Sequence, residues 1–173
     1  MANEKRRIRW FGSFALLGLL LILWFLGMPV IQMMQRSFEQ TAFEQVIRQL
    51  NRACSEVVIK AKASESAVLS DWIGRNPVDC LDDSGLSSWA YLGDETNPDV
   101  QPSASWIFDQ QESVLRYRWR DAEGLINQDP QADLVRLALR AEFADTNQNG
   151  IWDAGEAING LYLEPVYEYQ WLD

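Results

Sequence analysis

The sequence contains no histidine and only two cysteines among its 173 residues. Without histidine there is no imidazole general base, no Ser-His-Asp or Cys-His nucleophile and no histidine-containing zinc site. Bases are also scarce, because 15 Lys and Arg face 25 Asp and Glu, which gives a net charge of −10. Such an acidic chain is poorly suited to a phosphate backbone. We therefore expect neither an enzyme nor a nucleic-acid partner.

Charge is absent from residues 10–35, a run of 26 residues whose centre is rich in leucine. As a helix, this run would span about 39 Å, which exceeds the roughly 30 Å of a bilayer's hydrocarbon core. A cleaved secretory signal is the alternative, but its apolar region is usually shorter and ends at a small-x-small site, which is missing here. We predict an uncleaved transmembrane anchor over 10–35.

The short tail at 1–9 predicts the orientation of this anchor. Its four basic residues outweigh its single acid, and basic flanks stay on the cytoplasmic side. We therefore expect a single-pass protein of the bacterial inner membrane, with a cytoplasmic N-terminus and a periplasmic C-terminal domain. The periplasm is oxidising, which favours a disulfide between Cys54 and Cys80 over two buried thiols.

Beyond the anchor, apolar residues recur at spacings of three and four from Phe38 to Ala61, a pattern typical of an amphipathic helix. The pattern extends to Ile73, and Gly74 followed by Pro77 supplies a stop signal. We expect one long helix that is transmembrane over 10–35 and amphipathic over 36–74. Pro29 would bend it.

After Pro77 the apolar period changes from 3.6 to 2, which predicts strands. Candidate strands lie at 89–92, 105–108, 114–120, 135–143 and 161–171, although a helix remains an alternative at 135–143. The strands at 105–108 and 114–120 look like a hairpin, and Pro165 would fix an edge or a break in the last strand. Alternation in the third strand would place Arg116, Arg118 and Arg120 on a solvated outer face, which could also receive an acidic partner. We predict an α+β fold in which the long helix packs on a small antiparallel sheet of about four strands. Residues 75–173 would form one periplasmic domain with residues 36–74.

The sharpest motif lies at residues 145–156, where oxygen-bearing side chains stand at positions 1, 3, 5 and 9, glycine at 6 and glutamate at 12. This spacing matches the twelve-residue EF-hand loop for calcium, a hard cation that prefers oxygen ligands. The candidate ligands are Asp145, Asn147, Asn149, Ile151 through its carbonyl, Asp153 and Glu156. Three formal charges predict weak binding, with a dissociation constant of roughly 10⁻⁴–10⁻³ M. The alternative is an Asn-, Asp- and Gly-rich surface turn that binds nothing.

The basic tail, the proline-containing apolar segment, the amphipathic helix and the small antiparallel sheet together resemble type IV pilins and the pseudopilins of type II secretion. Within this superfamily the chain is most similar to the MshF family of MSHA pilus biogenesis proteins, in short stretches at 38–51, 76–78, 89–93, 106–109 and 115–118. The resemblance implies a pilin-like fold and a role in type IV pilus biogenesis. It also implies partners that are other pilin-like subunits or pilus assembly proteins.

The start of the apolar run departs from the family pattern. Prepilins carry Gly followed by Phe or Met, with Glu at the fifth position after the cleavage site, whereas Gly12 is followed by Ser13 and the fifth position is Leu17. We therefore expect an assembly accessory or a minor pilin rather than a major subunit. The alternative function is a membrane-anchored, calcium-dependent binding module or adhesin, whose loops at 85–102 or outer sheet face would recognise a ligand.

Overall fold

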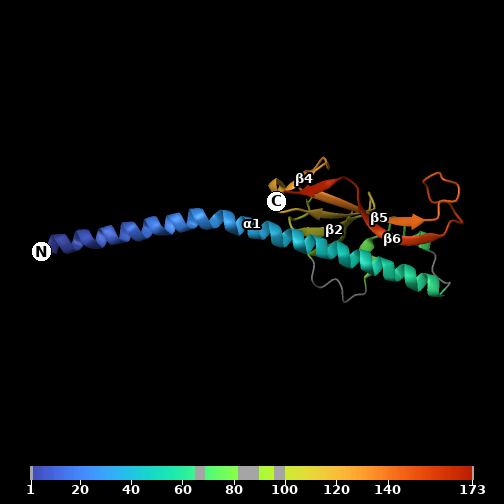
Figure 1. Ribbon diagram of the computed structural model, residues 1–173, viewed down its shortest axis with the longest axis horizontal. Coiled ribbons are helices and arrows are strands. Elements are labelled where there is room, and N and C mark those ends of the chain that lie inside the picture. The colour runs from blue at the N-terminus through green and yellow to red at the C-terminus, as the bar shows by residue number, and fades with distance from the viewer. Residues whose placement is uncertain (1, 65–68, 82–89, 96–99, 173) are drawn as a thin grey trace. The chain divides into compact units, whose positions relative to one another are not determined.

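A computed structural model describes residues 2–64, 69–81, 90–95 and 100–172 (Figure 1). The chain divides into two compact units, Met1–Thr41 and Ala42–Asp173. Helix α1 (Ala2–Ser64) supplies all the described residues of the first unit and the beginning of the second. The helical conformation continues through Pro29.

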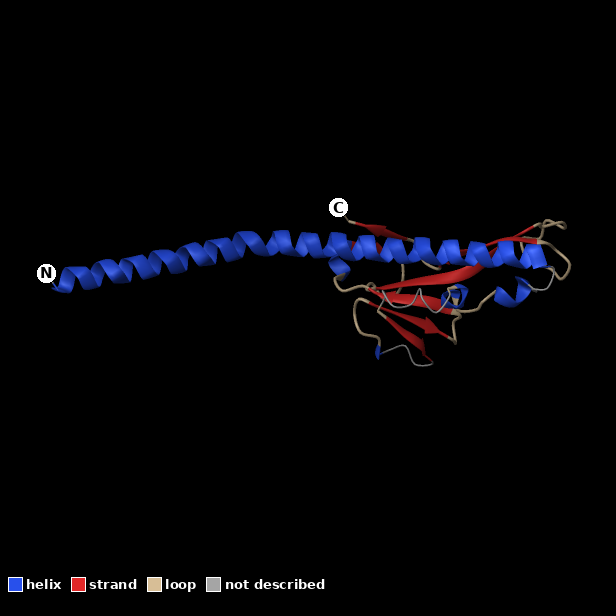
Figure 2. Cartoon of the chain, turned by 90° about the horizontal axis from the view of Figure 1, so that it is seen from below, coloured by secondary structure: helices blue, strands red, loops and turns tan. Residues whose placement is uncertain are grey.

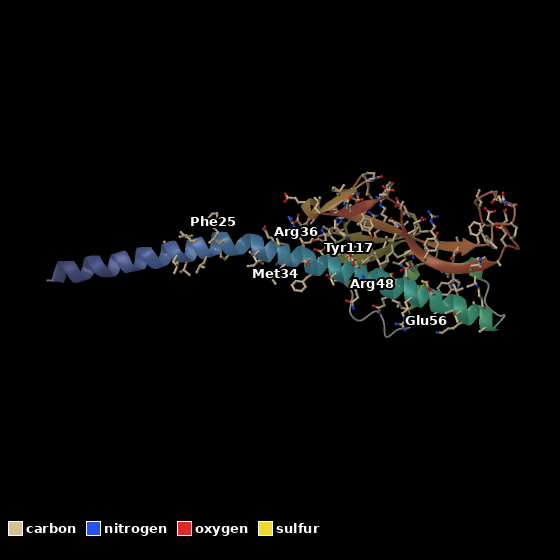
Figure 3. The ribbon with its side chains drawn as sticks, viewed as in Figure 1. Phe25, Met34, Arg36, Arg48, Glu56 and Tyr117 are labelled. Atoms are coloured by element: carbon tan, nitrogen blue, oxygen red, sulfur yellow. A yellow bond between two sulfur atoms is a disulfide. The ribbon has the colours of Figure 1, made fainter. Side chains whose placement is uncertain are left out.

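The first unit exposes apolar side chains on its helix. Trp24, Phe25 and Leu26 are 65%, 77% and 67% exposed, and Phe25 and Met34 project outward from α1 (Figure 3). Among the described residues, α1 is the one helix long and apolar enough to cross a membrane. Such a surface is costly in water and favourable in lipid. The chain thus carries an N-terminal helix that is suited to a single membrane crossing.

The second unit contains a five-stranded sheet and a two-stranded sheet (Figure 2). The larger sheet has the order β1-β2-β3-β5-β6, formed by Tyr91–Glu95, Ser105–Asp109, Val114–Arg118, Leu134–Phe143 and Ile158–Pro165. The smaller sheet pairs β4 (Leu125–Asn127) with β7 (Tyr169–Trp171). The α+β class is confirmed.

The expectation of a purely antiparallel sheet of about four strands was wrong. β1 lies parallel to β2, whereas the other pairs of the larger sheet are antiparallel. Whether two consecutive strands pair parallel or antiparallel depends on whether the connection between them crosses to the other end of the sheet. The alternation of apolar side chains does not carry this information. The expected last strand at 161–171 is two strands, because β6 ends at Pro165 and β7 joins the smaller sheet.

The amphipathic helix is shorter than predicted. α1 ends at Ser64 rather than near Gly74, and Leu69–Trp72 forms a separate 3₁₀ helix, while the predicted continuation through 65–68 lies outside the described residues. Serine favours turns and caps over helix interiors, which the apolar spacing alone did not reveal. Gly74 does adopt the left-handed φ of 76° expected of a stop signal.

The core forms where one face of α1 packs on the larger sheet. Phe43, Leu50 and Cys54 are at most 1% exposed. Phe43 lies among aromatic rings, with centroid distances of 5.1 Å to Trp106 and 5.1 Å to Tyr117. The predicted amphipathic packing is therefore present over the part of α1 that belongs to this unit.

The predicted hairpin of β2 and β3 is confirmed, but its arginine face is not solvated throughout. Arg116 is only 3% exposed, and its Nη1 lies 2.9 Å from Asp109 Oδ2. Its Nη2 donates to Gln131 Oε1 at 3.3 Å, so the segment after β4 covers this part of the sheet. Arg118 is half-buried, and Arg120 is exposed as expected.

The Cys54–Cys80 disulfide is present, as predicted. It joins α1 to the end of a second 3₁₀ helix, Pro77–Cys80. Asn76 caps that short helix, because its side-chain oxygen accepts a hydrogen bond from Val78 N at 3.0 Å. The bridge thus fixes the segment that follows α1 against the helix itself.

Candidate calcium-binding loop

The candidate loop at 145–156 connects β5 to β6 (Figure 1). Phe143 pairs with Ile158 in the ladder, and Ala144 N donates to Ala157 O at 2.9 Å just beyond it. Both ends of the loop are therefore held by an antiparallel hairpin. Because the hairpin holds both ends of the loop, the loop would lose less conformational entropy on binding an ion than a free segment would.

Asp145, at the first position, organises the turn. Its Oδ1 accepts from Asn149 N at 3.1 Å, and its Oδ2 accepts from Gly150 N at 2.8 Å. Gly150 has a φ of 74°, in the left-handed region that side chains disfavour. The glycine at position 6 therefore makes the sharp turn that the motif requires.

The two asparagines converge on Asp153. Asn147 Nδ2 and Asn149 Nδ2 donate to Asp153 Oδ2 at 2.6 Å and 2.8 Å. Their Oδ1 atoms accept from Asn149 N at 3.0 Å and from Ile151 N at 2.7 Å. Positions 3, 5 and 9 of the motif are thus brought together on one side of the turn.

Glu156, at position 12, folds back over the start of the loop. Its Oε1 accepts from Thr146 N at 2.8 Å and from Thr146 Oγ1 at 2.9 Å. Its Oε2 accepts from Asp153 N at 3.1 Å. The carboxylate therefore connects the first and last thirds of the loop through hydrogen bonds.

Side-chain oxygens of the five candidate ligands other than Ile151 accept hydrogen bonds from N–H and O–H donors in this arrangement. Within residues 2–64, 69–81, 90–95 and 100–172, no group of three or more His, Cys, Asp or Glu side chains is arranged to hold a metal ion. Ile151, whose carbonyl is the expected ligand at position 7, has a side chain that is 67% exposed. Binding an ion would require the oxygens to exchange these donors for the cation.

Two residues of the loop that the motif did not single out contribute to its geometry. Thr146 supplies two donors to Glu156, and Trp152 Nε1 donates to the Glu156 main-chain oxygen at 3.1 Å. Trp152 is half-buried although its neighbours Ile151 and Asp153 are exposed. The presence of Trp152 inside the predicted loop could have indicated this role from the sequence, because an indole N–H usually finds a hydrogen-bond partner when it is buried.

A second polar cluster lies where β1 meets the segment after α1. Asn76 Nδ2 donates to Tyr91 Oη and to Asp94 Oδ1, each at 2.7 Å, and Tyr91 Oη donates to Asp94 Oδ1 at 2.6 Å. Burial, and then the hydrogen bond to Asp94, raise the pKa of Tyr91 far above its usual range. Partial desolvation, and then the charge of Asp94, raise the pKa of Asp79. This hydrogen-bond network connects β1 to the segment that follows α1.

The unit also has an open hollow of about 560 Å³ on its surface. Its lining residues are Gln101, Ser103, Arg118, Trp119, Arg120, Ala122, Ala132 and Asp133. Of the loops at 85–102, expected as an alternative recognition surface, residues 85–89 and 96–99 lie outside the described residues. The volume of this hollow lies in the range of small-molecule sites, and the hollow is open to solvent.

Comparison with known proteins found no family model, no curated protein and no solved structure that matches this chain.

Proposed function

We propose that the chain is a membrane-anchored, pilin-like component of type IV pilus biogenesis of the MSHA type, acting as an assembly accessory or minor pilin. One observation carries this proposal. A single helix, α1, contains both an exposed apolar stretch and a stretch whose buried face packs on a mostly antiparallel sheet. In this proposal the helix is fixed in the inner membrane with its N-terminus in the cytoplasm, and Ala42–Asp173 lies in the periplasm.

The exposed face of α1 within the second unit supports association with other helices. Arg48 forms an ion pair with Glu44 at 3.2 Å, and Arg52 with Glu56 at 3.3 Å. Ile59 is 66% exposed on the same helix. Charged side chains beside an exposed apolar one are common at helix–helix interfaces, where the charges select the partner. The proposed partners are other pilin-like subunits or pilus assembly proteins.

Crosslinking from α1 tests this role. A photo-crosslinking residue at Ile59 should yield products with pilin-like subunits in cells that assemble pili. The matched control is the same residue at Ile126, which is 54% exposed on β4, far from α1 in sequence. Products from Ile126 but none from Ile59 would refute a helix-mediated role. The intact mass of the native protein, from inner membranes and from sheared pili, then separates an accessory from a minor subunit.

The proposal includes a structural calcium ion in the loop at 145–156. The residues present suit calcium, because they offer hard oxygen donors: the carboxylates of Asp145, Asp153 and Glu156, the amide oxygens of Asn147 and Asn149, and the Ile151 carbonyl. A bound ion would add an electrostatic crosslink across the turn. The chain's own role is to hold these oxygens on a closed hairpin, since β5 and β6 pair up to Phe143 and Ile158.

Terbium luminescence tests the ion site directly, because terbium resembles calcium and is excited by a nearby indole. Trp152 lies within the loop and should sensitise the bound ion, and calcium should displace it. Glu156→Gln should abolish the signal, whereas Glu164→Gln on β6, whose carboxylate lies 3.4 Å from Arg140, is the matched control. Equal signals from both variants would show that terbium binds elsewhere.

A binding module is the second candidate function, because the hollow lined by Arg118 and Arg120 has the size of a small-molecule site. In that case α1 would be only an anchor. A fragment that begins near residue 37 would then retain binding to the surface ligand. Loss of binding together with the helix would contradict this function and favour the first one.

A further inference from the structure

The sequence contains two Asn-Gly dipeptides in contrasting backbone settings. Asn149-Gly150 lies in the loop at 145–156, and Asn159-Gly160 lies in β6. An asparagine before glycine is chemically labile, because glycine has no side chain to shield its main-chain nitrogen from the neighbouring amide carbon. The two dipeptides share this chemistry, so a difference between their deamidation rates would arise from the fold.

We propose that Asn149 is a site of spontaneous deamidation through a succinimide formed with Gly150, and that β6 protects Asn159. Asn149 and Gly150 are both exposed, so water reaches them freely. The modified position is the fifth of the candidate calcium loop. The modification converts a neutral oxygen donor into a charged one.

Two hydrogen bonds assist the reaction at Asn149. Asp145 Oδ2 accepts from Gly150 N at 2.8 Å, which polarises the N–H bond that must break. Ile151 N donates to Asn149 Oδ1 at 2.7 Å, the oxygen that becomes negative when the amide carbon is attacked. A main-chain N–H aimed at a developing oxyanion lowers the barrier, as in an oxyanion hole. The loop therefore supplies both a polarised nucleophile and a stabilised intermediate.

The reaction proceeds in two steps, succinimide formation with loss of ammonia and then hydrolysis. The Gly150 main-chain nitrogen gives its proton to Asp145 Oδ2 as it attacks Asn149 Cγ, and Asp145 then passes the proton to hydroxide in solvent. The N–Cγ bond forms, the Cγ–Nδ2 bond breaks, and the side-chain nitrogen leaves as ammonia after taking a proton from water. Water then opens the succinimide at either carbonyl, giving aspartate or isoaspartate at position 149.

The strand setting opposes this reaction at Asn159. Asn159 is exposed and is the extra residue where the β5–β6 register shifts, between the Glu142–Gly160 and Phe143–Ile158 pairs. The residues on both sides of it are held in the ladder, and its main-chain oxygen accepts from Lys62 Nζ at 3.3 Å. A Cβ on Gly160 would lie 3.2 Å from the Glu142 side chain, so the space beside this glycine is already occupied. Closing a succinimide ring would require Gly160 to leave its pairing with Glu142. An opening that costs about 1.4 kcal/mol already slows a reaction tenfold.

The consequence for ion binding depends on the proposed calcium site. Aspartate at position 149 would raise the formal charge of the ligand set from three to four, and EF-hand loops tune their affinity by ligand charge. Isoaspartate would instead lengthen the main chain within the loop and displace the following oxygens. The loop would thus change its calcium affinity as the protein ages.

Peptide mapping by mass spectrometry tests the proposal on the full chain in detergent, incubated with chelator at mildly alkaline pH. Asn149 should deamidate on the order of tenfold faster than Asn159 in the folded protein. The two sites should react at equal rates after reduction and denaturation. Equal rates in the folded protein would overturn the proposal.

Asn147, which precedes Gln148 in the same loop, is the internal control for exposure. Deamidation of Asn147 as fast as Asn149 would overturn the assignment, because exposure alone would then decide the rate. Asp145→Asn should slow the reaction at Asn149 and leave Asn159 unchanged. An unaltered rate in this variant would refute the assistance from Asp145.

Added calcium separates this proposal from the calcium site. If the loop binds the ion, millimolar calcium should slow deamidation of Asn149, because Asp145 and the Asn149 amide oxygen would be engaged as ligands. An unchanged rate in calcium, with Asn149 still faster than Asn159, would refute the calcium link and support the modification site.

Discussion

Arg116 and Arg136 lie directly opposite each other on strands β3 and β5, as register partners on one face of the sheet. Like charges in this position repel, so the pair persists only because acids surround it. Asp109 Oδ2 lies 2.9 Å from Arg116, and Asp129 Oδ2 lies 3.0 Å from Arg136. Glu112 adds a third carboxylate at 3.0 Å from Arg136. The face predicted to be solvated is in part a buried, charge-balanced layer.

Breaking this layer at one residue should be costly. Asp109→Ala should lower the free energy of unfolding by about 3–5 kcal/mol, because it leaves Arg116 as an uncompensated buried charge. Urea unfolding of a fragment that begins at residue 42 measures this change. Glu164→Ala, which removes a half-exposed partner of Arg140, is the control and should cost at most about 1 kcal/mol. Equal costs would show that solvent reaches Arg116.

The aromatic cluster around Phe43 should be the largest single contributor to the core. Phe43 is 1% exposed and lies 5.1 Å from the Trp106 ring and 5.4 Å from the Trp171 ring. Phe43→Ala should therefore destabilise the unit by about 3–5 kcal/mol, through lost transfer energy and the cavity left behind. Ile59→Ala on the exposed face of the same helix should change stability little. A small effect at Phe43 would mean that the helix is not docked on the sheet.

Removal of the disulfide should also weaken the fold. The bridge closes a loop with a sequence separation of 26 between Cys54 and Cys80, for which chain entropy predicts about 3.5 kcal/mol of stabilisation. Cys54→Ser and Cys80→Ser, alone or combined, should give similar losses, because each removes the same bond. Thiol labelling of the native protein without reducing agent checks the premise, and two reactive thiols would contradict it.

Asp79 should make a contribution to stability that falls as pH rises, which is opposite to the contribution of most carboxylates. Asp79 is exposed, but partial desolvation by the surrounding chain, and then the charge of Asp94, raise its pKa in the folded state above the ordinary value of 3.8, although Arg75 lowers it in part. The folded state therefore binds the proton more tightly, so this contribution is fully present below pH 3.8 and is lost as pH rises through the raised pKa. Asp79→Asn should stabilise the unit at neutral pH and have little effect near pH 3. Equal effects at both pH values would refute this account.

The sequence predicted local features better than long-range ones. The β2–β3 hairpin followed from alternation and a short connection, and the Cys54–Cys80 bridge from the expected compartment. Arg116 was misplaced because alternation shows which side chains share a face but not what covers that face. The cover comes from Asp129 and Gln131, which lie after β4 and contact arginines of β3 and β5. The parallel pairing of β1 with β2 was missed for a similar reason, since it depends on a connection rather than on a strand.

The loop shows the same limit at the scale of single atoms. The motif selected Asp145, Asn149 and Glu156 by position, and the structure places them around one turn. It did not predict the hydrogen bond from Thr146 N to Glu156 Oε1, because position 2 is no ligand in the motif. Motif spacing specifies which oxygens face inward when an ion is bound. Motif spacing does not specify the N–H and O–H groups from which these oxygens accept hydrogen bonds.

Calcium should stabilise the second unit through Glu156. With a dissociation constant of about 10⁻⁴ M, about 10 mM calcium is a hundredfold excess and should add about 2.7 kcal/mol to the free energy of unfolding. Glu156→Gln should lose most of this gain, because a neutral amide cannot bind calcium bidentately as a carboxylate does. In chelator, Glu156→Gln should lower the free energy of unfolding by less than it does in calcium. The amide oxygen can still accept a hydrogen bond from Thr146, whose N lies 2.8 Å from Oε1 of Glu156. Urea unfolding in both media measures the difference, with Glu164→Gln as the control that keeps the full calcium response. An equal calcium gain in both variants would place the ion outside the loop, and no gain in the unmodified protein would leave the loop a hydrogen-bonded turn.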